Sequence, residues 1–301
     1  MRTHDGLELH VKTFGPDDAP LTVVLAHCWT ADVRDWHYQV HDLLAAYGHE
    51  VRILTWDHRG HGQSDAAEID TCTIPALARD MGNVIDAYAP DGPLVLAGHS
   101  IGGMTMMALA EERPDIVSRA RGALFVSTSS GRLGTVTLGL PEIAAARVRS
   151  TLPRVLALRA ALHSRTRRRR APAIERQIVR RFLFGENMRL SDQGLVVDQL
   201  INCPPATMEG FYRDFLVHDR LEALAAYDGV PTRVLVGDRD VLTPVPHARR
   251  LSGGIADARL LIVPGAGHML TLECSDLVST QLVELVDEAL SQRPAPLHAV
   301  V

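Results

Sequence analysis

The chain has 301 residues, of which 46% are hydrophobic, and its formal net charge at pH 7 is -5. This length and apolar content suffice to bury a large core, and the acidic balance gives no reason to expect a nucleic-acid partner. We therefore expect one main globular domain with room for an insertion, and no nucleic-acid-binding function.

Four cysteines, Cys28, Cys72, Cys203 and Cys274, are widely spaced and form no Cys-x-x-Cys pair. Their spacing predicts neither a disulfide framework nor a zinc site, and it favours a reducing compartment. The first residues contain no apolar core of a signal peptide, and no apolar run approaches the roughly 20 residues that cross a bilayer. We expect a cytoplasmic protein without membrane insertion.

The first part of the chain alternates predicted strands and helices. Asp5-Gly6 is a favoured tight-turn pair with alternating apolar residues behind it, so residues 1–14 are predicted to form a hairpin. Apolar runs predict buried strands over 21–26 and 51–56, and apolar residues at helical spacing predict a helix over 32–47. Such largely apolar strands are typical of a sheet covered on both faces.

A buried strand ending in a sharp turn is predicted around residue 100. The apolar run Leu94–Ala97 stops at Gly98-His99-Ser100-Ile101-Gly102, and residues 104–112 have the composition of a helix. A strand that turns directly into a helix exposes the residue at the turn, which here is a serine. Side chains at the two flanking glycine positions would hold the strand and the helix apart. This pattern predicts that Ser100 is a nucleophile.

The segment 98–102 resembles the nucleophile elbow of the α/β-hydrolase superfamily. Four further segments resemble motifs of the same superfamily: the oxyanion segment 25–29, the turn 57–64, the acid loop 237–240 and the histidine loop 265–268. The resemblance covers about residues 1–290 except for a middle insertion. It implies an α/β-hydrolase fold, with a mostly parallel central sheet flanked by helices and an inserted helical cap.

The resemblance also implies a catalytic triad. Ser100 is the expected nucleophile, Asp240 the expected acid and His268 the expected base, in the chain order of this architecture. Apolar runs predict strands over 232–236 and 259–263, just before Asp240 and His268. Parallel strands bring their C-terminal ends to one edge of the sheet, where Ser100 also lies. Asp238, in the same loop as Asp240, is the alternative acid.

The resemblance further implies an oxyanion hole that consists of the backbone N–H groups of Trp29 and Ile101. Cys28 departs from the family pattern, which usually has glycine there, and its side chain could change the backbone angle at Trp29. The expected pocket residues are Cys28, Trp29, Phe182 and Phe211. For Trp29, ordinary packing is the alternative.

The turn 57–64 combines Asp, Arg, Ser and two His residues, which is a composition also found in catalytic or metal sites. The pattern favours a structural turn, in which Gly60 and Gly62 supply unusual dihedral angles and Arg59 pairs with carbonyls and a carboxylate. His58 and His61 have no third ligand at a suitable spacing, so no metal site is predicted.

The inserted cap is predicted over residues 130–228, between a core formed by 1–129 and 229–293, and a C-terminal tail covers 294–301. Twelve arginines fall between positions 147 and 181, including four in a row at 167–170. They could attract an anionic group or membrane surface, but a solvated helix face is the favoured interpretation. Four of the six phenylalanines lie in the insertion, which suggests an apolar ceiling over the pocket or ordinary packing.

These features predict a serine hydrolase that cleaves a carboxylic ester, lactone or thioester and needs no metal or organic cofactor. Its expected partner is a small molecule with an apolar acyl or ring portion. Serine at position 100 argues against the dehalogenases and epoxide hydrolases of this superfamily, whose elbow carries aspartate. Carbon–carbon bond hydrolases, acyltransferases, perhydrolases, membrane-surface hydrolases and non-catalytic ligand-binding homologues remain as alternatives.

Overall fold

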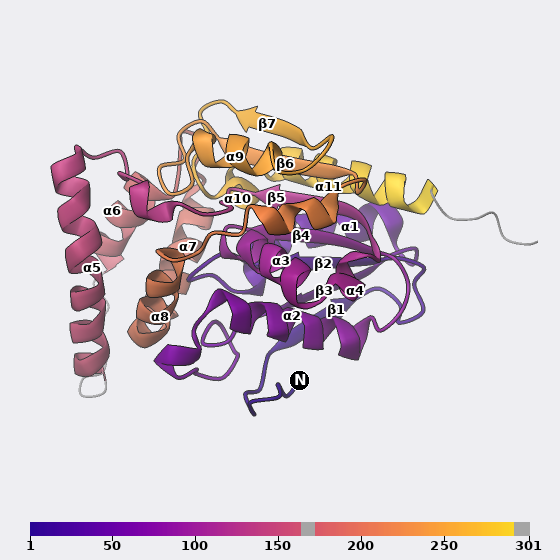
Figure 1. Ribbon diagram of the computed structural model, residues 1–301, viewed down its shortest axis with the longest axis horizontal. Coiled ribbons are helices and arrows are strands. Elements are labelled where there is room, and N and C mark those ends of the chain that lie inside the picture. The colour runs from indigo at the N-terminus through magenta and orange to yellow at the C-terminus, as the bar shows by residue number, and fades with distance from the viewer. Residues whose placement is uncertain (164–171, 292–301) are drawn as a thin grey trace, which may run out of the picture.

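A seven-stranded, mostly parallel sheet forms the centre of the protein (Figure 1). The computed structural model describes residues 1–163 and 172–291, so the arginine run at 167–170 and the predicted tail lie outside the described residues. The strand order is β1-β3-β2-β4-β5-β6-β7. The strands are β1 (Val11–Phe14), β2 (Thr22–Ala26), β3 (Arg52–Trp56), β4 (Leu94–His99), β5 (Ala120–Val126), β6 (Thr232–Gly237) and β7 (Arg259–Val263). This architecture confirms the predicted fold class.

The N-terminal segment differs from the predicted hairpin. Strand β1 pairs antiparallel with β3, with Val11 opposite Trp56, and all other strand pairs are parallel. Within the first ten residues, the turn at Gly6 closes a single bridge between Arg2 and Glu8. The edge of β3 offers a full row of backbone partners, which the short N-terminal segment cannot match.

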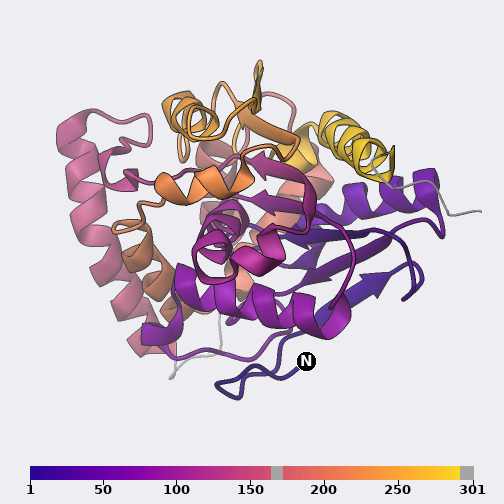
Figure 2. The same ribbon diagram turned by 45° about the vertical axis from the view of Figure 1, so that its right-hand side comes forward.

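Helices cover both faces of the sheet (Figures 1 and 2). The helices α2 (Ile74–Tyr88), α3 (Ile101–Glu112) and α9 (Val245–Ser252) contribute to one apolar core, and α1 (His37–Tyr47) and α11 (Ser275–Ser291) contribute to the other. Short helical segments connect them: η1 (Val33–Trp36), η2 (Ile69–Thr71), α4 (Pro114–Val117), η3 (Leu133–Thr135), η4 (Glu222–Tyr227) and α10 (Leu270–Glu273). Every residue of β2, β3, β4 and β6 is buried, because helices pack on both sides.

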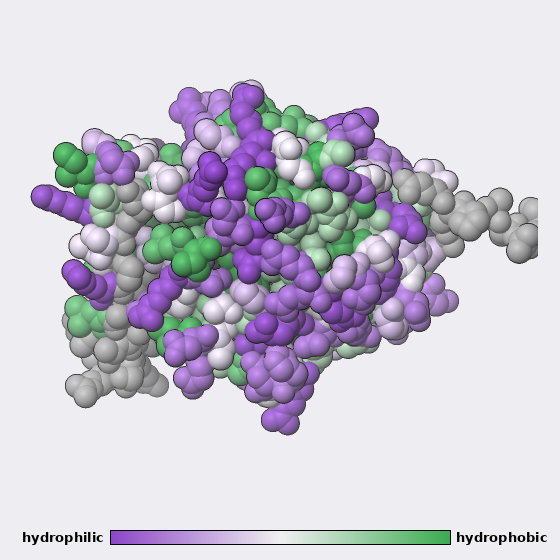
Figure 3. Space-filling model, in the orientation of Figure 1, coloured by the Kyte–Doolittle hydropathy of each residue, from purple (hydrophilic) through white to green (hydrophobic). Residues whose placement is uncertain are grey.

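Four helices follow one another between β5 and β6. They are α5 (Glu142–His163), α6 (Pro172–Phe182), α7 (Leu190–Asn202) and α8 (Pro205–Phe215), and we call them the inserted helices. They lie together beyond one end of the sheet, where α5 packs on α8 and α6 on α7 (Figures 1 and 2). The large apolar side chains that are exposed in the described part of the chain all belong to residues 143–217. Figure 3 shows apolar surface on this side of the molecule, interrupted by hydrophilic side chains.

No helix within the described ranges combines the length and the apolar character needed to cross a membrane.

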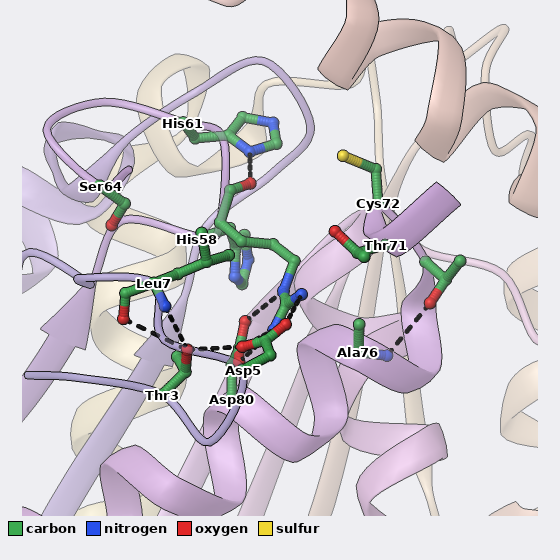
Figure 4. Close-up of polar contacts among 12 residues, drawn as sticks. Thr3, Asp5, Leu7, His58, His61, Ser64, Thr71, Cys72, Ala76 and Asp80 are labelled. Atoms are coloured by element: carbon green, nitrogen blue, oxygen red, sulfur yellow. Dashed lines mark hydrogen bonds and ion pairs between the residues drawn. The ribbon is translucent and has the colours of Figure 1, made fainter. Parts of the chain in front are cut away.

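The turn 57–64 is held by buried ionic contacts. The Arg59 guanidinium contacts Asp80 through Nε at 2.7 Å and Nη2 at 2.7 Å, and contacts Asp5 through Nη1 at 2.8 Å. Figure 4 shows the two carboxylates, Asp5 and Asp80, next to each other. Asp57 accepts hydrogen bonds from the backbone N–H groups of Val33 and Gln63. Arg59 therefore joins the N-terminal turn, the turn 57–64 and α2, as expected for a structural role.

Replacing Arg59 with methionine should destabilise the fold strongly. The Arg59 side chain is 1% exposed and Asp80 is fully buried, so the substitution leaves an unpaired carboxylate in the interior. Breaking a buried pair in this way costs about 3–5 kcal/mol of unfolding free energy. Urea denaturation followed by circular dichroism measures the loss.

Arg113→Met is the matched control. Arg113 also contacts two aspartates, Asp86 and Asp115, but its side chain is 32% exposed. Exposed pairs contribute at most about 1 kcal/mol. Equal losses in the two variants would contradict a dominant effect of burial.

Candidate active site

The turn between β4 and α3 places Ser100 in a strained backbone conformation. Its φ is 54° and its ψ is -113°, a region that residues other than glycine rarely adopt. A Cβ on Gly98 would lie 2.4 Å from the backbone of α3, and one on Gly102 would lie 2.2 Å from the carbonyl oxygen of Ala26. These close approaches explain why both positions are glycine. They fix Ser100 at the end of β4, where the residue is 8% exposed.

His268 and Asp240 form a buried pair at the same edge of the sheet. His268 follows β7 and Asp240 follows β6, and His268 Nδ1 lies 2.8 Å from Asp240 Oδ2. Asp240 also accepts hydrogen bonds from Leu242 N and from the backbone and hydroxyl of Thr243. Burial alone would raise the pKa of Asp240, but His268 and these hydrogen bonds hold it below its ordinary value. Beside an ionised Asp240, the neutral form of His268 carries its proton on Nδ1, and Nε2 is then an acceptor.

Asp238, the alternative acid, makes a different contact. It is exposed, and its Oδ1 accepts a hydrogen bond of 2.8 Å from the backbone N–H of Gly265. Asp238 therefore ties the acid loop to the histidine loop, while Asp240 contacts the imidazole itself.

The histidine loop lies against the nucleophile turn. His99, the residue before Ser100, places its Nε2 2.9 Å from the carbonyl oxygen of His268, and the two imidazole rings are 5.3 Å apart. The described structure contains no hydrogen bond between Ser100 Oγ and His268. Such contacts often tighten only when a substrate binds.

The two backbone N–H groups expected to form the oxyanion hole follow the ends of β2 and β4. Among the described residues, neither Trp29 N–H nor Ile101 N–H donates to a protein acceptor. Ile101 is the first residue of α3, where the helix leaves its N–H groups unpaired. The preceding N–H, that of Cys28, is already used, because it donates to Asp35 Oδ2 at 3.0 Å.

The expected pocket residues have different environments. The side chain of Cys28 is buried in an apolar cluster that also includes Phe184 and Met269, and burial raises the pKa of its thiol well above the ordinary value. Phe211 is completely buried in the core, where its ring lies 5.5 Å from His61. Phe182 is half-buried beneath the guanidinium of Arg181.

Two aromatic side chains of α8 pack against Trp29, and of these the expected apolar ceiling included Phe215 but not Tyr212. The Trp29 ring stacks with Tyr212 at 6.5 Å and contacts Phe215 edge to face at 5.2 Å. Tyr212 and Phe215 lie on the inserted helices, about 180 residues after Trp29 in the sequence. No local sequence pattern links either residue to Trp29. This cluster connects the oxyanion segment to the inserted helices.

The inserted segment also contacts the histidine loop, which the sequence did not predict. The carbonyl oxygen of Leu183 accepts hydrogen bonds from His268 N at 2.8 Å and Met269 N at 3.2 Å. The Glu273 carboxylate accepts from the backbone N–H groups of both Gly185 and Gly267. Residues 183–185 are therefore part of the support of His268.

Comparison with known proteins identifies the family. The model of a family described as "Alpha/beta hydrolase family" matches residues 23–281 of the chain. The chain belongs to this family. The lipase LipV of Mycobacterium tuberculosis is 38% identical to this α/β hydrolase over 112 residues, which are 37% of this chain and 40% of LipV.

Solved structures of other α/β hydrolases share the fold. An esterase from Thermogutta terrifontis superimposes with a TM-score of 0.75 at 22% identity, covering 95% of this chain and 96% of that one. An enol-lactonase from Burkholderia xenovorans LB400 gives a TM-score of 0.70 at 23% identity, covering 93% and 97%. At this identity the likeness shows the fold.

Replacing Gly102 with alanine should distort the turn at Ser100. The new Cβ would lie 2.2 Å from the backbone of Ala26, which cannot move without shifting β2. Overpacking of this kind costs about 1–3 kcal/mol. The midpoint temperature of thermal unfolding should fall, and so should the rate at which a fluorophosphonate labels the variant.

Gly194→Ala provides the control, because Gly194 is a helical glycine of α7 with nothing within 4 Å of an added Cβ. Alanine is favoured over glycine in a helix by about 1 kcal/mol, so this variant should be slightly stabilised. A Gly102→Ala protein as stable as Gly194→Ala would contradict the steric argument.

Proposed function

We propose that this α/β hydrolase is a serine hydrolase that cleaves a carboxylic ester, lactone or thioester through an acyl-enzyme on Ser100. The main support is the Asp240–His268 pair, which lies beside the strained turn that carries Ser100. Relatives and structural neighbours named lipase, esterase and enol-lactonase favour this reaction class. The proposed core comprises 1–129 and 229–293, and the proposed cap comprises 130–228.

The residues supply each step of the proposed reaction. A serine hydroxyl attacks poorly at neutral pH, so His268 Nε2 removes its proton as Ser100 Oγ bonds to the carbonyl carbon. Asp240 holds the imidazole in the required tautomer and stabilises its protonated form. The N–H groups of Trp29 and Ile101 stabilise the developing oxyanion, and losing one such donor typically costs about 3 kcal/mol of the barrier. His268 then protonates the leaving group and activates the water that releases the acid.

The proposed substrate has an apolar acyl or ring portion. The support is the aromatic cluster of Trp29, Tyr212 and Phe215 beside the proposed oxyanion segment. The proposed steps use only amino-acid side chains and backbone groups, without a metal or organic cofactor. The four cysteines are free thiols, which supports a cytoplasmic location.

Labelling with a fluorophosphonate, read by intact mass, tests the proposal. The wild-type protein should acquire one adduct and hydrolyse p-nitrophenyl esters, because the probe reacts with an activated serine. Ser100→Ala should lose both the adduct and the turnover.

Ser129→Ala is a matched control. Ser129 Oγ lies 2.7 Å from His247 Nδ1, so it is another buried serine beside a histidine, but it also donates to Gly131 O. This variant should label like the wild type. An adduct that persists in Ser100→Ala, or a wild-type protein that neither labels nor turns over ester, would refute the proposed nucleophile.

A second experiment tests the choice of acid. Asp240→Asn should lower kcat by roughly 10⁴-fold, because the amide favours the wrong tautomer of His268. Asp238→Asn should leave most of the activity, since Asp238 contacts only a backbone N–H of the histidine loop. The measurement is kcat for p-nitrophenyl ester hydrolysis, and the reverse ranking of the two variants would reject Asp240.

A further inference from the structure

Asp35 is a buried carboxylate that contacts three catalytic segments. It lies in η1 and is completely buried. Its Oδ2 accepts from the backbone N–H of Cys28 at 3.0 Å and lies 2.8 Å from His99 Nδ1. Its Oδ1 accepts from the Thr271 hydroxyl at 2.9 Å. These partners belong to the oxyanion segment, the nucleophile turn and the segment that follows His268.

His99 extends these contacts to His268. Its Nδ1 faces the Asp35 carboxylate and its Nε2 faces the carbonyl oxygen of His268 at 2.9 Å. Both neighbours are acceptors, so both ring nitrogens must donate, which only the protonated imidazolium does. Burial alone lowers the pKa of His99, but Asp35 and the His268 carbonyl outweigh it and raise the pKa above its ordinary value.

The other titratable groups around His99 and Asp35 add no unpaired charge to this pair. Burial raises the pKa of the Cys28 thiol and lowers the pKa of His27, so both are neutral. Asp240 is the other charged group that acts on His99, and it is paired with His268.

Cys28, Asp35 and His99 also place three potential metal ligands within 4.8 Å of one another. The oxygens of Asp35 already accept from three donors, and one of these is His99 Nδ1. These hydrogen bonds account for the cluster as a polar network.

We propose that the His99–Asp35 ion pair is a positioning device that sets the alignment of His268, Ser100 and the Trp29 N–H. The contact to Cys28 N–H fixes the peptide that precedes the Trp29 donor. The contact to His268 O fixes the backbone of the general base. His99 directly precedes Ser100 in the chain, so fixing His99 also fixes the nucleophile turn. This role rests on the proposed serine-hydrolase function.

His99→Asn tests the role. The shorter amide still reaches Asp35 in place of Nδ1, but it cannot reach His268 O and it carries no charge. A misalignment of about 1 Å costs roughly 100-fold in rate, so kcat for p-nitrophenyl butyrate should fall by about that factor with little change in KM. The acid limb of the kcat/KM profile should move to higher pH, because the variant lacks the positive charge whose ring lies 5.3 Å from His268.

His218→Asn is the matched control. His218 is 2% exposed and its Nε2 contacts the carbonyl oxygen of Ser129 at 3.0 Å, so it is also a buried histidine bonded to the backbone. This variant removes a similar hydrogen bond between a buried imidazole and a backbone carbonyl, but outside the three segments that Asp35 contacts. Its kcat and pH profile, normalised to the folded fraction by circular dichroism, should match the wild type.

A folded His99→Asn protein with wild-type kcat and pH profile would overturn the proposal. If His99→Asn does not fold, Thr271→Val tests the proposal instead. Valine has nearly the shape of threonine, so this variant removes only one hydrogen-bond donor to Asp35. A reduced kcat at unchanged KM supports the positioning role, and unchanged kinetics overturn it. A wild-type protein that neither labels with fluorophosphonate nor hydrolyses the ester overturns the proposed function itself.

Discussion

The backbone must turn from β4 into α3 within a single residue, and much of the surrounding structure accommodates that turn. Ser100 adopts a positive φ, and its N–H donates to Val126 O at the end of β5. Helix α3 approaches β2 so closely that only glycine fits at position 102. The C-terminal ends of three neighbouring strands therefore meet around the serine. Strain of this kind persists only where the surrounding packing enforces it.

Buried carboxylates hold the loops at this edge of the sheet. Asp35, Asp57, Asp240 and Glu273 each accept a hydrogen bond from the backbone N–H of a loop residue, namely Cys28, Gln63, Thr243 and Gly267. A carboxylate suits this task because it accepts several hydrogen bonds without offering a donor. The loops can consequently be irregular and still satisfy their buried N–H groups.

The sequence predicts the parts of the candidate site that depend on local patterns. Ser100 is marked by a strand, two glycines and a helix, and Asp240 and His268 follow recognisable strands at family positions. Asp35 and Thr271 lie 236 residues apart and are brought together only by the fold, so neither carries a local signal. The same holds for Tyr212, whose contact with Trp29 depends on how α8 packs. The N-terminal turn was predicted, but the partner of β1 was not, since pairing depends on which strand edge is available.

The bonds from Leu183 O to the histidine loop have a consequence for the design of chimaeric enzymes. An inserted segment that only covered a pocket could be exchanged between relatives as a module. Here residues 183–185 supply an acceptor to His268 N and a donor to Glu273, so they belong structurally to the histidine loop although they lie in the inserted segment. A transplant that changes substrate preference would have to end before residue 183 or begin after residue 185, so that the native 183–185 stay with the recipient. The natural boundary for recombination thus differs from the boundary between β5 and β6.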